Sequence, residues 1–206
     1  MAYSRAEESW GVAVATRYLA VGAMVPAAEF GVGALATQAR TNMAYREDGL
    51  AMLRAGLGAK EVVGALVEGD EWRRERQIGV VDRDGVAAAW TGEDCGPFAD
   101  ARLGEGYAIQ GNLLAGAEVL AAMEHAWLTG DTTIPLAGQL LAALVAGDEV
   151  GGDRRGRQSA ALYVVGPRGI GDGSHVETDL RVDDAPQPIS ELSRLWRLHR
   201  QPHGKS

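Results

Sequence analysis

Polar side chains gather at the ends of several apolar segments of this 206-residue sequence. Those that follow an apolar run are Thr37, Gln38, Asn42, Thr91, Cys95, Gln110 and Asn112, and those that precede one are Asp153, Arg154, Arg155, Arg157, Gln158 and Ser159. If these ends converge, one site holds amides, hydroxyls, a carboxylate and guanidinium groups, a mixture that suits recognition of carbonyls and carboxylates. The same groups could instead satisfy backbone ends and turns, so both interpretations stay open.

The elements that must position these residues follow from the hydrophobic pattern. Apolar runs predict strands over residues 11–16, 31–39, 107–112, 159–165 and 177–184, and the segment 76–92 predicts two strands joined by a turn at Asp84-Gly85. Apolar residues at helical spacing predict helices over 49–57, 59–69, 116–128, 135–146 and 188–200. Residues 17–30, broken by Gly22 and Pro26, are predicted to be a packed connection.

Blocks of strands alternate with pairs of helices in this order, which predicts an α+β layered sandwich and not a βαβ repeat. The length suits one domain, which we place at residues 1–200, followed by a flexible tail over 201–206.

Composition limits the partners and the compartment. At a net charge of −8 no overall field attracts the protein to nucleic acid or to an anionic membrane, and the aromatic fraction of 6% argues against base-stacking surfaces. The longest uncharged run, residues 132–147, is too short for a membrane span. Cys95 is the only cysteine and the first ten residues lack an apolar core, so we expect a reducing, cytoplasmic location without a signal peptide.

Common cofactor and metal motifs are not found. The glycine-rich segments 56–61 and 166–173 lack the spacing of a dinucleotide or phosphate loop and are predicted to be turns. The histidines, His125, His175, His199 and His203, are not paired at metal-ligand spacing, and no serine-hydrolase elbow is present. We therefore expect neither a metal ion nor a cofactor.

Five long segments, at residues 11–39, 76–92, 106–116, 147–165 and 179–195, resemble the bacterial family known as domain of unknown function 1028. The similarity runs from about Ala2 to His199. The resemblance implies an Ntn-hydrolase-like fold, a four-layer αββα sandwich in which two mostly antiparallel sheets stack face to face between outer helices.

The resemblance also implies an amino-terminal nucleophile. In active Ntn hydrolases residue one is Thr, Ser or Cys, and its own α-amino group, with an ordinary pKa of about 8, serves as the base. The family typically opens with a strand resembling Thr-Phe-Ser-Ile-Val. Aligned without gaps, residues 2–14 match the hairpin turn and second strand, so the opening strand is expected to be absent. Neither Met1 nor Ala2 supplies a nucleophile, and a gapped alignment of residues 2–4 still places Ala first.

Two explanations of this departure stay open. Translation has been assigned to an internal Met, and the natural protein starts a few residues upstream; or the chain is a degenerate member of the family that binds its ligand without hydrolysing it. A second departure is the segment 97–104, which stands where the family tends to carry Trp-Ala-Gly-His. Cys95 follows Glu93 and Asp94, which raise a thiol pKa and so do not activate it.

With this fold in view, we assign roles to the polar residues as hypotheses. Asp153 holds an amine, Arg155 takes a substrate carboxylate and Asn112 donates to the oxygen of the scissile carbonyl. The residues expected to bind substrate around them are Thr37, Gln38, Asn42, Gln110, Gln158 and Ser159. An Asp–Arg pair that merely fixes a turn is the alternative.

Three functions therefore compete. The first is a small-molecule amidohydrolase that acts on a C–N amide bond of a polar or anionic substrate. The second is an inactive binding protein that uses the same cleft. The third is a structural subunit, since the apolar helix faces at 119–128 and 139–147 could pack between protomers of a homo-oligomer.

Overall fold

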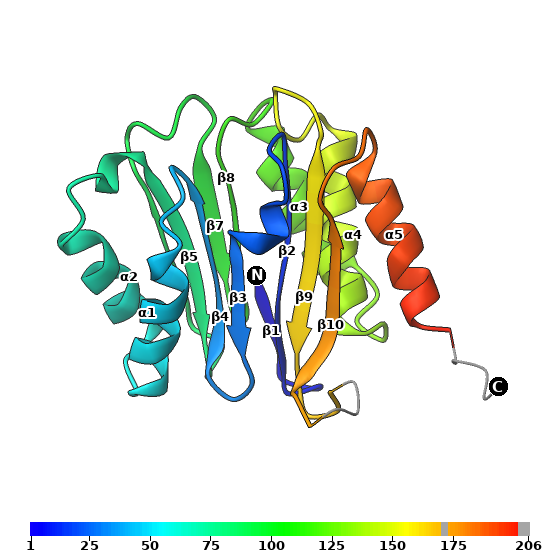
Figure 1. Cartoon of the computed structure of the whole chain (residues 1–206), viewed down its shortest axis with the longest axis horizontal. Coiled ribbons are helices and arrows are strands. Elements are labelled where there is room, and N and C mark those ends of the chain that lie inside the picture. The colour runs from blue at the N-terminus through cyan, green and yellow to red at the C-terminus, as the bar shows by residue number, and fades with distance from the viewer. Residues whose placement is uncertain (170–172, 202–206) are drawn as a thin grey trace.

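The computed structural model describes residues 1–169 and 173–201, so most of the predicted tail and part of the glycine-rich turn at 166–173 lie outside the described residues. Two antiparallel sheets stack face to face, and helices cover both outer faces (Figure 1). The predicted α+β sandwich with four layers is confirmed.

The larger sheet has six strands in the order β10-β9-β2-β1-β8-β7. Their bounds are β1 (Ala2–Ser4), β2 (Ser9–Thr16), β7 (Asp100–Gly104), β8 (Tyr107–Gly111), β9 (Ser159–Val165) and β10 (Val176–Val182). The smaller sheet has the order β3-β4-β5-β6, with β3 (Pro26–Glu29), β4 (Gly33–Ala39), β5 (Arg76–Asp82) and β6 (Ala87–Thr91). Antiparallel pairing throughout lets each strand send alternate side chains to the two faces.

Valine and alanine side chains form part of the core between the sheets. Val12 and Val14 of β2 face this core, together with Ala34 and Ala36 of β4, while Leu35 points to the opposite face of its sheet. Trp10 of β2 belongs to the same core and stacks on Tyr3 of β1, so the two sheets share side chains of mixed size.

Within the described residues, five α-helices form the outer layers. On the smaller sheet lie α1 (Ala44–Arg54) and α2 (Ala59–Glu68), and on the larger sheet lie α3 (Glu118–Thr129), α4 (Leu136–Glu149) and α5 (Pro188–His199) (Figure 1). Two 3-10 turns, η1 (Val21–Ala23) and η2 (Arg73–Glu75), lead into β3 and β5. The start of α2 is fixed by Asp82, whose Oδ2 accepts the Ala59 N–H at 3.0 Å.

Two strands were not predicted. Residues 17–30 were expected to be a packed connection, yet they contain η1 and the edge strand β3, which begins at Pro26. Proline is tolerated at the first residue of an edge strand, so its presence did not exclude one. Segment 97–104 contains β7, whose polar residues match an edge position with partial exposure.

The expected absence of an opening strand is also corrected. Residues Ala2–Ser4 form β1, which lies in the middle of the larger sheet between β2 and β8. Ala2 is opposite Gly11 of β2 and Tyr107 of β8. Because β1 has only three residues whereas β2 has eight, β2 and β8 extend past the beginning of β1. This difference in length creates the site described next.

Candidate functional site

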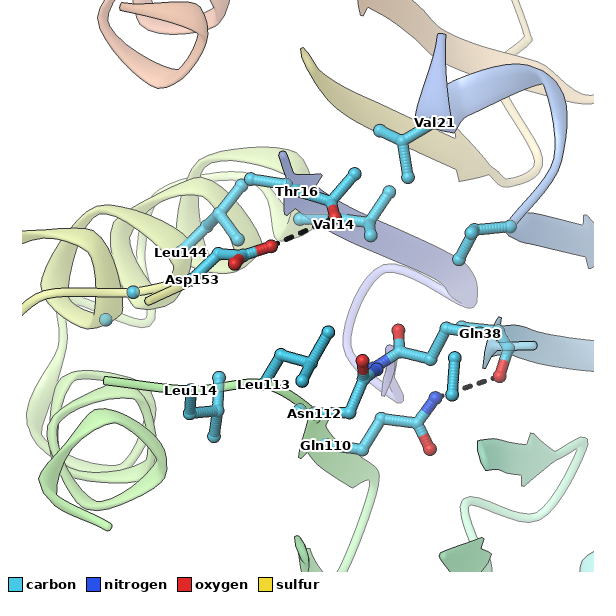
Figure 2. A pocket seen from close by; sticks show the side chains of 18 of the residues that line it. Val14, Thr16, Val21, Gln38, Gln110, Asn112, Leu113, Leu114, Leu144 and Asp153 are labelled. Carbon is cyan, nitrogen blue, oxygen red and sulfur yellow. Dashed lines mark hydrogen bonds between the residues drawn. The ribbon is translucent and has the colours of Figure 1, made fainter. Parts of the chain in front are cut away.

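A cavity of about 570 Å³ lies beyond the beginning of β1, between β2 and β8. Figure 2 shows Val14 and Thr16 of β2 on one side and Gln110 and Asn112, from β8 and its end, on the other. Cavities of this volume commonly bind small molecules when a few polar groups converge on an apolar surface.

The chain begins at the floor of this cavity. The α-amino group of Met1 donates to the Ala108 carbonyl oxygen at 3.0 Å, and Met1 is one of the lining residues. Burial disfavours the charged amine and lowers its pKa from 8.0 to about 5. The amine is therefore neutral at pH 7, the form in which an amine can accept a proton.

Apolar side chains form the walls on both sides of the sheet. Toward the helices the lining includes Leu114, Leu140 and Leu144, and toward the space between the sheets it includes Val14 and Val21. A ligand thus meets hydrocarbon over most of its length and polar groups at defined points.

Gln77 organises the amide groups at one side of the cavity. Its Oε1 accepts from Gln38 Nε2 at 2.7 Å and from Asn112 Nδ2 at 3.1 Å, and its Nε2 contacts the Gly111 carbonyl oxygen at 2.8 Å. Gln77 is fully buried, although it lies outside the cavity lining. It belongs to β5, so it joins the two sheets and fixes the orientation of Gln38 and Asn112.

Gln110 reaches across the space between the sheets. Its Nε2 donates to the Ala36 carbonyl oxygen of β4 at 2.9 Å. Its Oε1 is buried and has no hydrogen-bond partner in the described part of the chain. Buried polar atoms are usually satisfied, so this oxygen is an unpaired acceptor beside the cavity.

The loop before β9 brings Asp153 and Arg155 to the mouth of the cavity. Gly151, Gly152 and Gly156 have φ values of 120°, 54° and 106°, conformations that favour glycine, and they turn the chain tightly around Asp153. Asp153 Oδ2 accepts from Arg155 Nη2 at 2.6 Å, from Thr16 Oγ1 at 3.2 Å and from the Arg17 N–H at 3.0 Å.

This coordination sets the charge state of the pair. Burial opposes ionisation of Asp153, but the hydrogen bonds from Arg155 and from the Arg17 and Arg155 backbone N–H groups outweigh it and lower the pKa of the carboxyl. The hydrogen bond to Asp153 also raises the pKa of Arg155. Asp153 and Arg155 therefore form an ion pair whose two opposite charges cancel.

The other arginines at the mouth are paired in the same way. Arg40 Nη1 lies 3.2 Å from Glu75 Oε1, and Arg157 Nε lies 2.5 Å from Asp148 Oδ1. Each of these arginines has an acidic partner, so the charges at the mouth largely cancel. The paired side chains can still form hydrogen bonds with both the positive and the negative group of a dipolar molecule.

The structure thus brings together five of the nine predicted site residues, Gln38, Gln110, Asn112, Asp153 and Arg155, around one cavity. It places the other four outside its lining. Thr37 is fully buried in β4 with its Oγ1 unpartnered in the described part of the chain. Gln158 donates to Asp184 Oδ1 at 3.1 Å, and Ser159 donates to the Tyr18 carbonyl oxygen at 2.5 Å.

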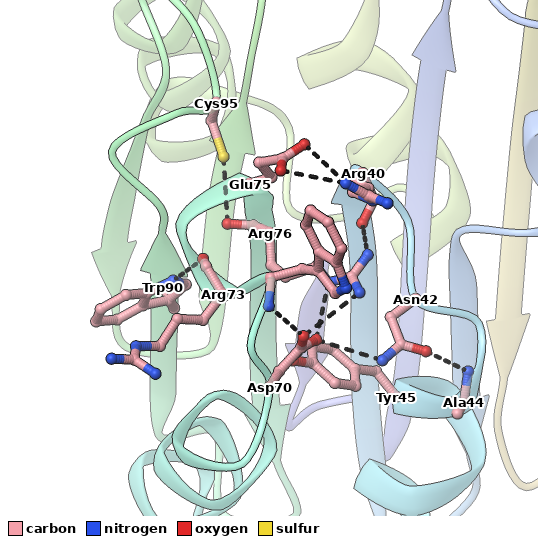
Figure 3. A network of polar contacts seen from close by, with 11 residues as sticks. Arg40, Asn42, Ala44, Tyr45, Asp70, Arg73, Glu75, Arg76, Trp90 and Cys95 are labelled. Carbon is pink, nitrogen blue, oxygen red and sulfur yellow. Dashed lines mark hydrogen bonds and ion pairs between the residues drawn. The ribbon is translucent and has the colours of Figure 1, made fainter.

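Asn42, the fourth, belongs to a separate network around Asp70 (Figure 3). Asp70 Oδ2 accepts from Arg76 Nε at 2.8 Å and from Tyr45 Oη at 2.7 Å, and Asn42 Nδ2 lies 3.5 Å from the same oxygen. Burial of Asp70 opposes its ionisation, but the hydrogen bonds from Arg76, Tyr45 and the Trp72 backbone lower its pKa far below the usual range. This network ties the segment between α2 and η2, and strand β5, to α1.

Cys95 has no catalytic environment. Its Sγ donates to the Arg76 carbonyl oxygen at 3.2 Å, and burial, with smaller contributions from Asp94 and Glu75, raises the pKa of the thiol despite the hydrogen bond from the Gly92 backbone. Within residues 1–169 and 173–201, no group of three or more His, Cys, Asp and Glu side chains could hold a metal ion. Nor is any helix of the described chain long and apolar enough to cross a membrane.

Two contributors were missed by sequence reasoning. Gln77 looked like an ordinary polar residue at the start of a strand, and only its place between the sheets reveals its role. Met1 was considered only for its side chain, whereas its buried α-amine forms part of the cavity floor. The role of Gln77 could have been indicated only by a weak signal, namely an amide side chain directly before an apolar run, as in Gln77-Ile78.

Comparisons with known proteins identify the family of this chain and a solved structure with a similar fold. Residues 1–192 match the model of a family described as "Family of unknown function (DUF1028)". The crystal structure of protein SPO2555 from Silicibacter pomeroyi, assigned to the same family model, is similar with a TM-score of 0.89 and 29% sequence identity. The similarity covers 98% of this chain and 88% of that one. None of the curated proteins matches the sequence significantly.

Proposed function

Because this chain belongs to the DUF1028 family of unknown function, its role must be argued from the cavity, and we propose that the cavity binds a small polar molecule containing an amide bond. The observation that carries this proposal is the convergence of the Met1 amine, the Asn112 and Gln110 amides and the Asp153–Arg155 pair on one cavity. Amides and guanidinium groups donate to carbonyl and carboxylate oxygens, and Asp153 accepts from amines.

The reaction that this arrangement supports is hydrolysis of that C–N bond in the Ntn manner. A hydroxyl or thiol on the residue that carries the α-amine would attack the carbonyl carbon while the neutral amine takes its proton. Asn112 would donate to the oxygen that becomes negative, and the amine would leave with a proton from the α-ammonium group. Water would then release the acid from the ester or thioester.

A second candidate, binding without hydrolysis, is favoured by the side chain of residue one. Met1 carries a thioether, which is not an acyl-accepting nucleophile, and it packs among the residues between the sheets. Turnover by this route requires Thr, Ser or Cys at the residue that bears the amine, and binding without hydrolysis does not.

A screen of N-acetyl amino acids and amino acid amides tests both candidates. Binding is measured as a ligand-dependent rise in melting temperature, which follows from selective binding to the folded state, and hydrolysis is measured as release of new primary amine or ammonia. We expect stabilisation without turnover. Stabilisation by none of these compounds would contradict the proposed binding function.

Two variants test the assigned residues. Asp153→Asn and Arg155→Ala should each weaken binding by about tenfold or more, because a charge-assisted hydrogen bond is lost in a partly buried site. The matched control is Arg181→Ala, since Arg181 pairs with Asp183 two residues away in the same local spacing but does not line the cavity. Equal affinity of all three variants and the parent would remove the role of the Asp153–Arg155 pair.

A further inference from the structure

Of the described residues, three arginines line the cavity, and two of them already use the edge of the guanidinium that best binds a ligand. The parallel Nε–H and Nη2–H groups of an arginine form a fork that fits a carboxylate. Arg155 donates from these two nitrogens to Asp153 at 2.9 and 2.6 Å. Arg157 donates from the same two nitrogens to the side chain and the carbonyl oxygen of Asp148, at 2.5 and 3.2 Å. Neither arginine therefore offers its fork to a bound molecule.

Arg40, the third, keeps this fork free. It donates to Glu75 Oε1 and Oε2 through Nη1 alone, at 3.2 and 3.3 Å. Its Nε–H and Nη2–H groups have no hydrogen-bond partner within residues 1–169 and 173–201. The ion pair with Glu75 thus leaves unoccupied the donors that a ligand carboxylate would use.

The position of Arg40 is fixed through both its side chain and its backbone. The guanidinium carbon lies 3.6 Å from the centroid of the Trp72 ring, and the Trp72 N–H donates to Asp70 Oδ1 at 2.8 Å. The Arg40 N–H donates to the Glu75 carbonyl oxygen at 3.0 Å, and its own carbonyl oxygen accepts from Arg76 (Figure 3). The buried network around Asp70 and Arg76 therefore holds both Arg40 and the ring on which it stacks. An arginine held in this way loses less conformational freedom when a ligand binds.

The backbone before Arg40 carries an independent sign of a binding site. Ala39, the last residue of β4, has a φ of 64°, in the left-handed region that residues with a side chain seldom adopt. Such conformations persist where the surrounding contacts hold them, and they are common at ligand sites. Ala39 lines the cavity together with Arg40.

The charges beside Arg40 select the kind of anion. Glu75 and Asp94 also line the cavity, and both carboxylates act on the Cys95 thiol, so their negative charges lie close to one point. They repel a doubly charged group such as phosphate more strongly than a singly charged one. A carboxylate is therefore the better match for the fork.

We propose that Arg40 binds the carboxylate of the ligand through its Nε–H and Nη2–H groups, and that Trp72 is the positioning residue that presents them. The hypothesis drawn from the sequence gave this role to Arg155, whose donors are instead directed at Asp153. The inference rests on the proposed binding function, for which it names the ligand group and its recognition residue. It does not depend on hydrolysis.

A matched pair of ligands tests the assignment. The N-acetyl amino acid that stabilises the protein most in the screen is compared with its own carboxamide, which differs only in lacking the carboxylate. Arg40→Gln should weaken binding of the acid by about tenfold or more and binding of the amide by less than about threefold, because only the acid engages the fork. Arg40→Lys keeps the charge without the fork and should weaken binding of the acid by a similar factor. Both variants keep the backbone contacts of residue 40.

Two other arginine variants serve as controls. Arg74→Gln removes an exposed arginine that pairs with Asp94 but does not line the cavity, so it should change neither affinity by more than about threefold. Arg155→Ala should weaken binding of the acid and the amide by similar factors, because its guanidinium acts through Asp153. If Arg155→Ala abolishes the preference for the acid while Arg40→Gln keeps it, the carboxylate lies at Arg155 and the inference is overturned.

The role of Trp72 has its own readout, the ratio of the affinities for acid and amide. Trp72→Leu should lower this ratio by about threefold or more, whereas Trp72→Phe, which keeps an aromatic face under the guanidinium, should preserve most of it. A loss of stability in Trp72→Leu with an unchanged ratio would remove the positioning role.

Two further outcomes separate this inference from the binding function. If Arg40→Gln binds the acid as tightly as the parent protein does, the Arg40 assignment fails and the binding function stands. If inorganic phosphate displaces the acid at a lower concentration than acetate does, the carboxylate class is wrong. If no compound binds the parent protein, both proposals fail.

Discussion

The buried amine of Met1 makes stability depend on pH in an unusual window. An α-amine has a pKa of about 8 in the unfolded chain, and burial lowers it to about 5 in the folded protein. Between these values the unfolded state binds more protons than the folded state, so the free energy of unfolding falls as pH decreases. The penalty is absent well above pH 8 and complete below pH 5.

The expected size follows from the two pKa values. From pH 8 to pH 6 the amine should lower the free energy of unfolding by about 2 kcal/mol, since each unit of pKa difference corresponds to about 1.4 kcal/mol. Carboxylates with lowered pKa values, such as Asp70 and Asp153, lose their contribution only at more acidic pH, because a group of this kind stabilises above its unfolded pKa. The chosen window therefore isolates the amine from them.

Urea denaturation at pH 8, 7 and 6 measures the effect, with a chain acetylated at Met1 as the matched control. Acetylation removes the titration, and the adjoining cavity has room for the acetyl group. Contributions that are common to the two proteins cancel in the difference between them. The unmodified protein should lose about 2 kcal/mol more than the acetylated one. A difference below about 0.5 kcal/mol would show that water in the cavity solvates the amine and that the burial argument is wrong.

Three further predictions concern buried polar groups. In urea denaturation, Asp70→Asn should lower the free energy of unfolding by about 3 kcal/mol, because it leaves the buried Arg76 guanidinium without its charged partner. The control Asp94→Asn removes an exposed ion pair and should leave the urea midpoint unchanged. Equal effects of the two substitutions would contradict this reasoning. Gln77→Leu should lower the free energy of unfolding by about 3 kcal/mol, since it leaves buried amide and carbonyl groups of both sheets without hydrogen-bond partners. An unchanged free energy of unfolding would show that water replaces the Gln77 side chain as their partner. Burial raises the pKa of the Cys95 thiol, so at pH 8 Cys95 should react slowly with a disulfide reagent in the folded protein and quickly in urea. A fast reaction in the folded protein would contradict the burial of this thiol.

Much of the framework could be predicted from local sequence. Strands β2 and β9 and the helices α2, α4 and α5 carry continuous or periodic apolar patterns whose burial is required wherever they pack. Gly85, at φ 81°, occupies the turn that Asp84-Gly85 predicted. The loop before β9 was also identified by its glycines and charges. The short strands β1, β3 and β7 were not predicted: the ungapped family alignment left no room for β1, Pro26 and Gly22 made the segment of β3 look like a connection, and β7 carries polar residues without a clear alternation.

The sequence by itself determined the class of fold, the residue types of the cavity and the loop that carries Asp153 and Arg155. Only the tertiary structure decided which polar residues meet. Thr37 and Gln38 are neighbours in β4, yet they point to opposite faces, and only Gln38 reaches the cavity. The length of β1 relative to β2 and β8 likewise created the cavity and brought the Met1 amine to its floor. Strand register and side-chain direction depend on pairing between distant segments, and local sequence does not encode that pairing.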